Sequence, residues 1–199
     1  MNIGVLALQG AFAEHLAALR KLGANGVEIR QRADFHAGLD GIILPGGEST
    51  VMGKLLRELE LYAPIRDAIA AGMPVLSTCA GLILLAERAE NNEKTYFALM
   101  DITVRRNAYG RQLGSFRTTT DIAGIGPYPM VFIRAPFISS VGPKAHVLAT
   151  VDGHVVAARQ QNMLATAFHP ELTDDLRVHS YFVNMIAQVN ANCCQQQTA

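Results

Sequence analysis

A histidine and a glutamate two positions apart form the first group in this sequence that could carry out chemistry. They lie in the string Phe168-His169-Pro170-Glu171. Because Pro170 disfavours helical backbone in the residue before it, we expect an extended segment at His169. In such a segment residues i and i+2 point to the same side, so Glu171 can hold one imidazole nitrogen while the other accepts a proton. The alternative is a helix cap by Glu171, with His169 on the surface.

A cysteine could supply the nucleophile that such a base activates. Cys79 follows an apolar segment at residues 74–78 and precedes another that begins at Ala80. This pattern predicts a strand-to-helix turn with the thiol at a helix N-terminus, where the helix dipole favours the reactive thiolate. Ser77 and Gly81, two positions to either side, are small, as the crowded turn of a nucleophile elbow requires. The alternative is an ordinary buried cysteine that acts as a small apolar residue.

Backbone donors for a substrate could come from a glycine pair. Gly46 and Gly47 follow an apolar strand-like segment, which places their N–H groups at the sheet edge where open α/β sheets bind ligands. Gly47, together with the N–H of Ala80 directly after the nucleophile, could form an oxyanion hole. The alternative for this segment is a tight turn followed by a helix cap, for which Ser49 or Thr50 is suited.

Three arginines within seven residues form a local basic site in an otherwise neutral chain: Arg105, Arg106 and Arg111. They could bind a carboxylate or phosphate, or dock a partner protein. The alternative is a solvated strand edge or loop, since most charged residues are simply exposed.

The other five histidines have no carboxylate two residues away in an extended stretch. We interpret them as surface residues or as interior residues with satisfied hydrogen bonds. They are His15, His36, His146, His154 and His179.

Alternating strands and helices in the first half would bring these groups to one edge of a sheet. The alternation predicts a mainly parallel sheet with helices on both faces. The expected strands are residues 3–8, 27–32, 41–45 and 74–78, and the expected helices are residues 12–22, 50–61, 64–71 and 82–88.

The second half adds strand-like segments and a final helix. Asp152-Gly153 predicts a type I′ hairpin between two of these strands. The expected strands are residues 102–105, 130–134, 146–151, 154–159 and 163–167, and the helix is residues 173–189. The fold class is therefore three-layer α/β, with a mainly parallel central sheet, flanking helices and added antiparallel strands.

Bulk composition narrows the class of protein. The 199 residues are 50% hydrophobic with a formal net charge of zero, which gives no indication of nucleic-acid or membrane binding. We expect one domain over residues 1–190 and a polar, disordered tail at 191–199. Without a leader or a membrane-spanning stretch, we expect a cytoplasmic protein. The three cysteines suggest neither a disulfide framework nor a metal site, and we expect no cofactor.

Six strings, in order along nearly the whole chain, resemble class I glutamine amidotransferases, whose fold is flavodoxin-like. The resemblance is closest to the Pdx2/PdxT family, the glutaminase subunits of pyridoxal 5′-phosphate synthase. The strings are Leu6-Ala7-Leu8-Gln9-Gly10-Ala11, residues 45–50, Thr78-Cys79-Ala80-Gly81, residues 106–112, Ile133-Arg134-Ala135-Pro136 and residues 168–173. One departure is Ser77, where the family often has glycine; because serine is also small, we expect the turn to survive.

The resemblance implies a role for each matching residue. Cys79 would attack the side-chain amide of glutamine and form a glutamyl thioester, His169 would transfer the protons, and Glu171 would orient His169. The glutamine-binding positions would be Gly46, Gly47, Glu48, Arg106, Ile133 and Arg134. Gln9 and Gly10 would meet a partner subunit near the exit for ammonia.

The resemblance also implies a partner and leaves two alternatives. In this family ammonia passes to a separate (β/α)₈-barrel synthase subunit that makes pyridoxal 5′-phosphate, and the glutaminase is weak until it docks. One alternative is an amidotransferase of the same class that feeds a different synthase. The other is a catalytically silent subunit that only binds a partner.

Overall fold

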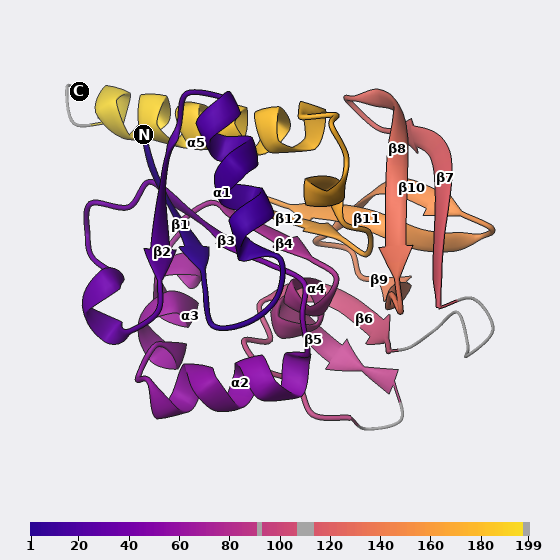
Figure 1. The fold of residues 1–199 in the computed structure, drawn as a ribbon, viewed down its shortest axis with the longest axis horizontal. Coiled ribbons are helices and arrows are strands. Elements are labelled where there is room, and N and C mark those ends of the chain that lie inside the picture. The colour runs from indigo at the N-terminus through magenta and orange to yellow at the C-terminus, as the bar shows by residue number, and fades with distance from the viewer. Residues whose placement is uncertain (91–92, 107–113, 197–199) are drawn as a thin grey trace.

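A single large sheet forms the centre of the molecule (Figure 1). The computed structural model describes residues 1–90, 93–106 and 114–196, and side chains as far as residue 191. Within these residues the sheet has ten strands, in the order β2-β1-β3-β4-β12-β11-β9-β6-β5 with β10 paired to β11. A separate ribbon of two strands, β7 and β8, stands beside it.

The strands that lead to the site are parallel, and three of them are fully buried. The parallel run comprises β2 (Asn25–Ile29), β1 (Asn2–Leu6), β3 (Gly41–Leu44), β4 (Val75–Thr78) and β12 (Met163–Thr166). Every residue of β3, β4 and β12 is buried, which explains why these segments are continuous apolar or small-residue runs rather than alternating ones.

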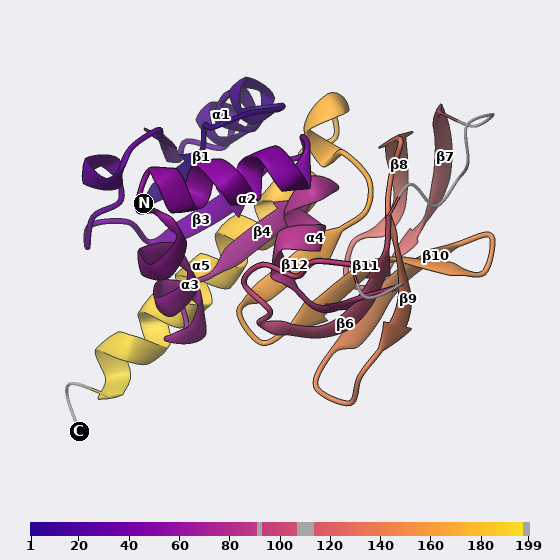
Figure 2. The same cartoon turned by 90° about the horizontal axis from the view of Figure 1, so that it is seen from below.

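Helices cover both faces of this parallel run, as Figures 1 and 2 show from two directions. One face carries α1 (Phe12–Lys21) and α5 (Arg177–Gln196). The opposite face carries α2 (Ser49–Glu58), α3 (Tyr62–Ala70) and α4 (Ala80–Leu85). The predicted three-layer α/β class is confirmed, and the sheet edge at the ends of β3, β4 and β12 is where the site residues lie.

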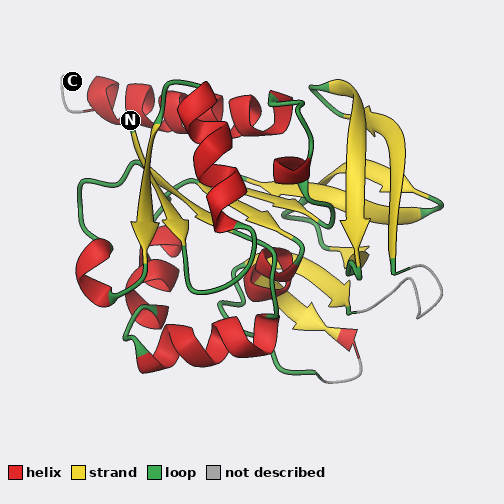
Figure 3. Cartoon of the chain, viewed as in Figure 1, coloured by secondary structure: helices red, strands yellow, loops and turns green. Residues whose placement is uncertain are grey.

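The second half extends the sheet with mostly antiparallel strands (Figure 3). They are β5 (Ala86–Ala89), β6 (Met100–Arg105), β9 (Phe137–Val141), β10 (His146–Val151) and β11 (His154–Gln160), and the ribbon is β7 (Ser115–Ile122) with β8 (Gly126–Ile133). Asp152 and Gly153 have φ of 50° and 77°, the paired positive values that a type I′ turn needs. The predicted hairpin is confirmed.

One predicted helix ends earlier than expected because its last residues join the sheet. The helix expected over residues 82–88 stops at Leu85, and Ala86 turns to φ −57°, ψ 133°. Residues 86–89 instead pair with β6, where Arg88 donates to Asp101 at 2.7 Å. Strands β5, β7 and β9 were not among the expected strands.

The last helix was predicted too early at both ends. Residues 170–172 form a short 3₁₀ helix (Pro170–Leu172), and α5 begins only at Arg177, whose N–H donates to the Asp175 carboxylate at 3.0 Å. At the other end, no glycine or proline follows the predicted stop at Val189, and α5 continues to Gln196. Residues 191–196, expected to be a disordered tail, are therefore helical; residues 197–199 lie outside the described part. No helix in the described residues is long and apolar enough to cross a membrane.

Candidate active site

Cys79 occupies a strained turn between β4 and α4. Its φ of 48° and ψ of −103° are unusual for a residue other than glycine, and such conformations cost of order 1–3 kcal/mol unless their surroundings impose them. Its N–H donates to Thr166 O at 2.9 Å, so the end of β12 fixes the turn. The elbow geometry predicted from the sequence is confirmed.

The small residues around Cys79 are required by close contacts. A Cβ at Gly81 would overlap the carbonyl oxygen of Leu44, which belongs to the backbone and cannot move aside by a change of side-chain rotamer. Ser77 is fully buried, and its hydroxyl lies 3.4 Å from Leu164 O. Serine therefore fits where the family often has glycine.

The chain segment that follows β12 places His169 beside the thiol. Its N–H donates to Val131 O at 2.8 Å, which ties it to the neighbouring strand β8. Its Nδ1 lies 2.7 Å from Glu171 Oε1, and both residues are only 7% exposed. Glu171 sits in a 3₁₀ turn instead of the extended segment that we expected, yet its carboxylate still meets the imidazole.

The environment of this pair favours its charged form. Burial alone would lower the pKa of His169, but the hydrogen bond with Cys79, together with the hydrogen bond and charge of Glu171, raises that pKa to about 10. Burial would raise the pKa of Glu171, but the fields of His15 and His169 and the hydrogen bond from His169 hold it below its ordinary value. The arrangement can therefore keep a proton on His169 at neutral pH beside the sulfur of Cys79.

A cavity of about 330 Å³ opens in front of the thiol. This volume is within the range of small-molecule sites. It is lined by Gln9, Gly10, Ala11, Gly46, Gly47, Glu48, Ser49, Cys79, Ala80, Ile83, Arg106, Ile133, Arg134, Pro136, His169 and Leu172. The catalytic, substrate-binding and partner residues expected from the sequence all lie on its wall except Glu171, which lies behind His169. Arg105, also singled out, is not on this wall and is paired with Glu90.

The glycine segment at residues 46–47 lies against the thiol and the imidazole. A Cβ at Gly46 would be 2.4 Å from His169 Cε1 and 3.3 Å from Cys79 Cβ. Gly10 (φ 89°) supports this segment from outside, since a Cβ there would overlap the Gly46 carbonyl oxygen. The Gln9 side chain adds to this support because its Oε1 accepts from Glu48 N at 2.9 Å.

Glu48 caps α2, a function that the sequence analysis gave to Ser49 or Thr50. Its carboxylate accepts from Thr50 N at 3.4 Å and from Thr50 Oγ1 at 3.0 Å. Its side chain is thus engaged with the helix, while its backbone borders the cavity. The segment therefore combines a helix cap, made by Glu48 and not by Ser49 or Thr50, with a position at the cavity.

Arg106 reaches the cavity wall but already has a counter-ion. Its Nε lies 2.8 Å from Glu93 Oε2, in an ion pair that is not aligned as a hydrogen bond, and its guanidinium lies 5.8 Å from the centre of the Tyr96 ring. The rest of the 106–112 string, with Arg111, lies outside the described residues.

Ile133 and Arg134 form the opposite rim. Both are exposed, and the Ile133 carbonyl oxygen lies 4.0 Å from Cys79 Sγ. Arg134 has a φ of 42°, and its N–H donates to Gly114 O at 2.6 Å. The end of β8 therefore turns sharply beside the thiol.

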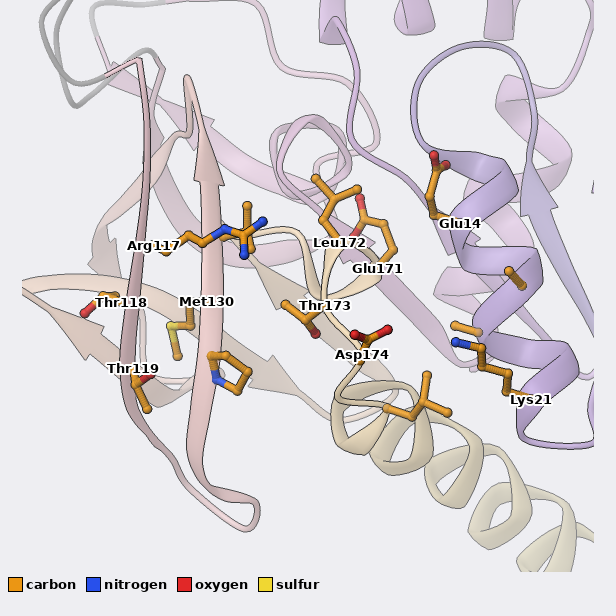
Figure 4. A pocket seen from close by; sticks show the side chains of 15 residues that line it. Glu14, Lys21, Arg117, Thr118, Thr119, Met130, Glu171, Leu172, Thr173 and Asp174 are labelled. Carbon is orange, nitrogen blue, oxygen red and sulfur yellow. The ribbon is translucent and has the colours of Figure 1, made fainter.

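A larger pocket of about 770 Å³ lies behind the His169–Glu171 pair, between α1 and the β7–β8 ribbon (Figure 4). Glu14, Lys21 and Arg117 are on its wall, and Glu171 borders it from the side of the site. Cys79 does not line this pocket. A substrate that reacts with the thiol must therefore occupy the smaller cavity.

Two histidines that were not predicted to belong to the site reach it from behind. His15 and His179 are fully buried, and His15 Nε2 lies 3.4 Å from Glu171 Oε2. Their side chains meet although they are 164 positions apart in the chain. No spacing rule within the sequence could have found them.

Comparison with known proteins agrees with the fold. A solved structure described as a glutamine amidotransferase superposes with a TM-score of 0.88 at 41% identity, covering 93% of this chain and 98% of that one. PurLQS from Thermotoga maritima superposes with a TM-score of 0.67 at 15% identity over 92% of this chain and 97% of its own, which shows the fold alone. The class is thus that of the glutamine amidotransferases.

The family follows from the sequence matches. Residues 5–188 match the SNO glutamine amidotransferase family, and the chain belongs to that family. The pyridoxal 5′-phosphate synthase subunit PdxT of Haemophilus influenzae (strain PittEE) is 57% identical over 188 residues, 93% of this chain and 98% of the relative. PdxT of Streptococcus pneumoniae (strain ATCC 700669 / Spain 23F-1) is 56% identical over 188 residues, 93% of this chain and 97% of its own.

Proposed function

We propose that this chain is the glutaminase subunit of a pyridoxal 5′-phosphate synthase. It hydrolyses L-glutamine to L-glutamate and ammonia, and the ammonia passes to the synthase subunit. The observation that carries the proposal is the 2.7 Å contact between His169 Nδ1 and Glu171 Oε1, beside a cysteine on a strained elbow that faces a cavity. The identity of more than half to PdxT proteins over nearly the full chain supports the choice of substrate.

The first half of the reaction forms a thioester. The Cys79 sulfur attacks the carboxamide carbon of glutamine, and the proton held by His169 goes to the departing nitrogen. The C–N bond breaks, ammonia leaves, and the glutamyl group stays on sulfur. The raised pKa of His169 supports this step because the proton is already on the imidazole when the leaving group needs it.

The second half returns the enzyme to its starting state. Neutral His169 takes a proton from water, whose oxygen attacks the thioester carbon, and glutamate leaves as the sulfur regains its charge. Glu171 keeps the imidazole oriented and stabilises its cationic form throughout. The negative oxygen that develops in both halves would be held by the N–H groups of Gly47 and Ala80, both of which border the cavity.

Binding of the amino-acid part falls to the outer wall of the cavity. The guanidinium of Arg106 can hold the substrate carboxylate once it exchanges its contact with Glu93. The backbone of Glu48 and of the 133–134 turn can meet the remaining polar groups, and Gly46 lets His169 and Cys79 pack closely against this wall.

The partner in this proposal is a synthase subunit with a (β/α)₈ barrel, and both proteins act in the cytoplasm. Gln9 and Gly10 border the cavity and support residues 46–48, so a protein that docks on them would reach the substrate segment directly. This supports a glutaminase that is weak alone and activated on docking.

Release of ammonia and glutamate from glutamine tests the proposal. The purified chain should show low activity that rises when a pyridoxal 5′-phosphate synthase subunit is added, and ¹⁵N from the amide of glutamine should appear in the product of that subunit. Activity that ignores the synthase subunit would favour an amidotransferase with another partner. No hydrolysis with any synthase would favour a silent binding subunit.

A further inference from the structure

Behind Glu171 the buried polar contacts continue through two more histidines. His15 on α1 places its Nε2 3.4 Å from Glu171 Oε2 and its Nδ1 2.9 Å from His179 Nε2. His179 lies in the first turn of α5, and both histidines are fully buried. The series His169, Glu171, His15 and His179 therefore joins the site to the first and the last helix of the chain.

Only one oxygen of Glu171 is used by His169. Oε1 contacts His169 Nδ1, whereas Oε2 is buried and has no aligned hydrogen bond among the described residues. Burying a carboxylate oxygen without a donor is costly. His15 Nε2 lies at the same distance, 3.4 Å, from this oxygen and from its hydrogen-bond partner Thr78 Oγ1, directly before the nucleophile, so its N–H can be shared between the two oxygens.

An unpartnered nitrogen decides which atoms of the two rings carry protons. Burial lowers the pKa of His15 and lowers that of His179 to about 3, so each ring is neutral at neutral pH and has one N–H. His179 Nδ1 is buried without a hydrogen-bond partner in the described structure. If His179 carried its proton on Nδ1, that N–H would be buried without an acceptor. His179 Nε2 would then accept from His15 Nδ1, and His15 Nε2 would present a lone pair, not a proton, to the Glu171 carboxylate. The favourable state has both protons on Nε2, with that of His15 facing Glu171.

We propose that His15 is a positioning residue for glutamine hydrolysis: its Nε2–H holds Oε2 of Glu171, so that Oε1 stays aligned with His169, and His179 fixes the tautomer of His15. This inference rests on the proposed function, because it assigns His15 a part in the same reaction. An N–H that donates to Oε2 also favours the ionised form of Glu171, and the charge of Glu171 in turn helps to keep the proton on His169. A residue that only filled the core would act on stability and not on this alignment.

Two substitutions of His15 separate donation to Glu171 from packing. The amide nitrogen of glutamine can take the place of Nε2, so His15→Gln keeps a donor toward Glu171. The shorter asparagine reaches only the position of Nδ1, so His15→Asn keeps a partner for His179 and loses that donor. In the complex with the synthase subunit, His15→Asn should lower kcat by about 10–100-fold, the range seen when partners that orient a functional histidine are removed. KM for glutamine should not change, and His15→Gln should retain most of kcat.

A chemical measurement tests the inference without glutamine turnover. The rate at which iodoacetamide alkylates Cys79, followed on its peptide by mass spectrometry, reports how much thiolate the His169–Glu171 pair maintains. At neutral pH alkylation should be slower in His15→Asn than in wild type and in His15→Gln. If wild type releases no ammonia, the proposed function fails, whereas this series still decides the role of His15.

Equal kcat and equal alkylation rates in the two His15 variants would overturn the inference. It would also be overturned if the decreases in kcat and alkylation rate simply followed the decrease in thermal stability. If His15→Asn does not fold, the same comparison is made at His179. His179→Gln keeps an Nε2-like donor toward His15, and His179→Leu removes it. The leucine variant should have the lower kcat at unchanged KM, and equal values would overturn the inference.

Discussion

The two sides of Cys79 are built in opposite ways. On the proton side, His169 and Glu171 are 7% exposed, and His15 and His179 behind them are fully buried. On the substrate side, Gly47, Glu48, Ile133 and Arg134 are all exposed. The first side is held by helices and strands from both ends of the chain, and the second by turns.

This difference separates two tasks. Side chains in a packed interior have few alternative positions, so the fold alone can keep the proton-transfer groups aligned. Exposed turns have lower local stability and respond to what docks on them. We therefore expect changes on the proton side to lower kcat at constant KM, and changes on the substrate side to alter KM.

Removal of the thiol should have the largest effect. Cys79→Ala should lower ammonia release by at least about a thousandfold, because the covalent route is lost and only binding and oxyanion stabilisation remain. An assay of ammonia with the synthase subunit present measures it. A variant with Cys193→Ser and Cys194→Ser, thiols without a proposed role, should retain activity. Ammonia release unchanged by Cys79→Ala would remove the basis of the proposed mechanism.

Glu171→Gln should come next, with kcat lower by about 10²–10⁴-fold, because the acid–base contribution of His169 depends on the carboxylate that orients it. The neutral amide keeps the size of Glu171 but no longer stabilises the imidazolium. KM for glutamine should remain close to wild type in steady-state kinetics. Asp174→Asn removes an exposed carboxylate three residues away and is the matched control. If Glu171→Gln raised KM as well as lowering kcat, the proposed division between a proton side that sets kcat and a substrate side that sets KM would be contradicted.

On the substrate side, Arg106→Ala should raise KM. Loss of a charge-assisted hydrogen bond costs about 1.5–3 kcal/mol, or roughly 10–100-fold in affinity, if Arg106 holds the substrate carboxylate. Steady-state kinetics over a range of glutamine concentrations measures it, with little change expected in kcat.

Two controls sharpen the Arg106 result. Arg117→Ala removes an exposed arginine of the rear pocket and should leave KM unchanged. Glu93→Gln removes the counter-ion of Arg106 and should lower KM or leave it constant, because the guanidinium is released for substrate. If Glu93→Gln raised KM as Arg106→Ala does, the ion pair itself, and not substrate binding, would explain both.

The last effect concerns how the stability of the folded protein depends on pH. The pKa of His169 is raised to about 10 in the folded protein from about 6.5 in an unfolded chain. Its stabilisation is therefore fully present below about pH 6.5 and is lost as pH rises toward about 10. Chemical denaturation of wild type and His169→Asn should give a difference in unfolding free energy that shrinks over this range. A difference that grew with pH would mean that the folded pKa is lowered.

Local rules were sufficient for the proton-side residues that are close in sequence. The elbow at Cys79 follows from a strand, a helix and small neighbours. The His169–Glu171 contact was predicted from their spacing, although Glu171 reaches the imidazole from a 3₁₀ turn and not from an extended segment. The type I′ turn at residues 152–153 follows from its dipeptide. In each case the information lies within a few residues of the feature.

Contacts between distant segments could not be predicted in this way. The ion pair of Arg106 with Glu93 and the contact of His15 with His179 depend on how the packed elements meet. The predicted ends of two helices were wrong for a related reason. Residues 86–89 pair with β6 as strand β5, and no residue ends α5 at Val189. At residues 86–89 pairing with the sheet overrides helix propensity. At Val189 the sequence contains no helix stop signal, so a longer α5 should have been predicted.

The contact between His15 and His179 has a consequence for how the enzyme is made. Translation proceeds from the N-terminus, so His15 emerges from the ribosome 164 residues before His179. The support behind Glu171 can close only after α5 has been made. A terminated product that lacks α5 would carry Cys79 and even His169 without that support.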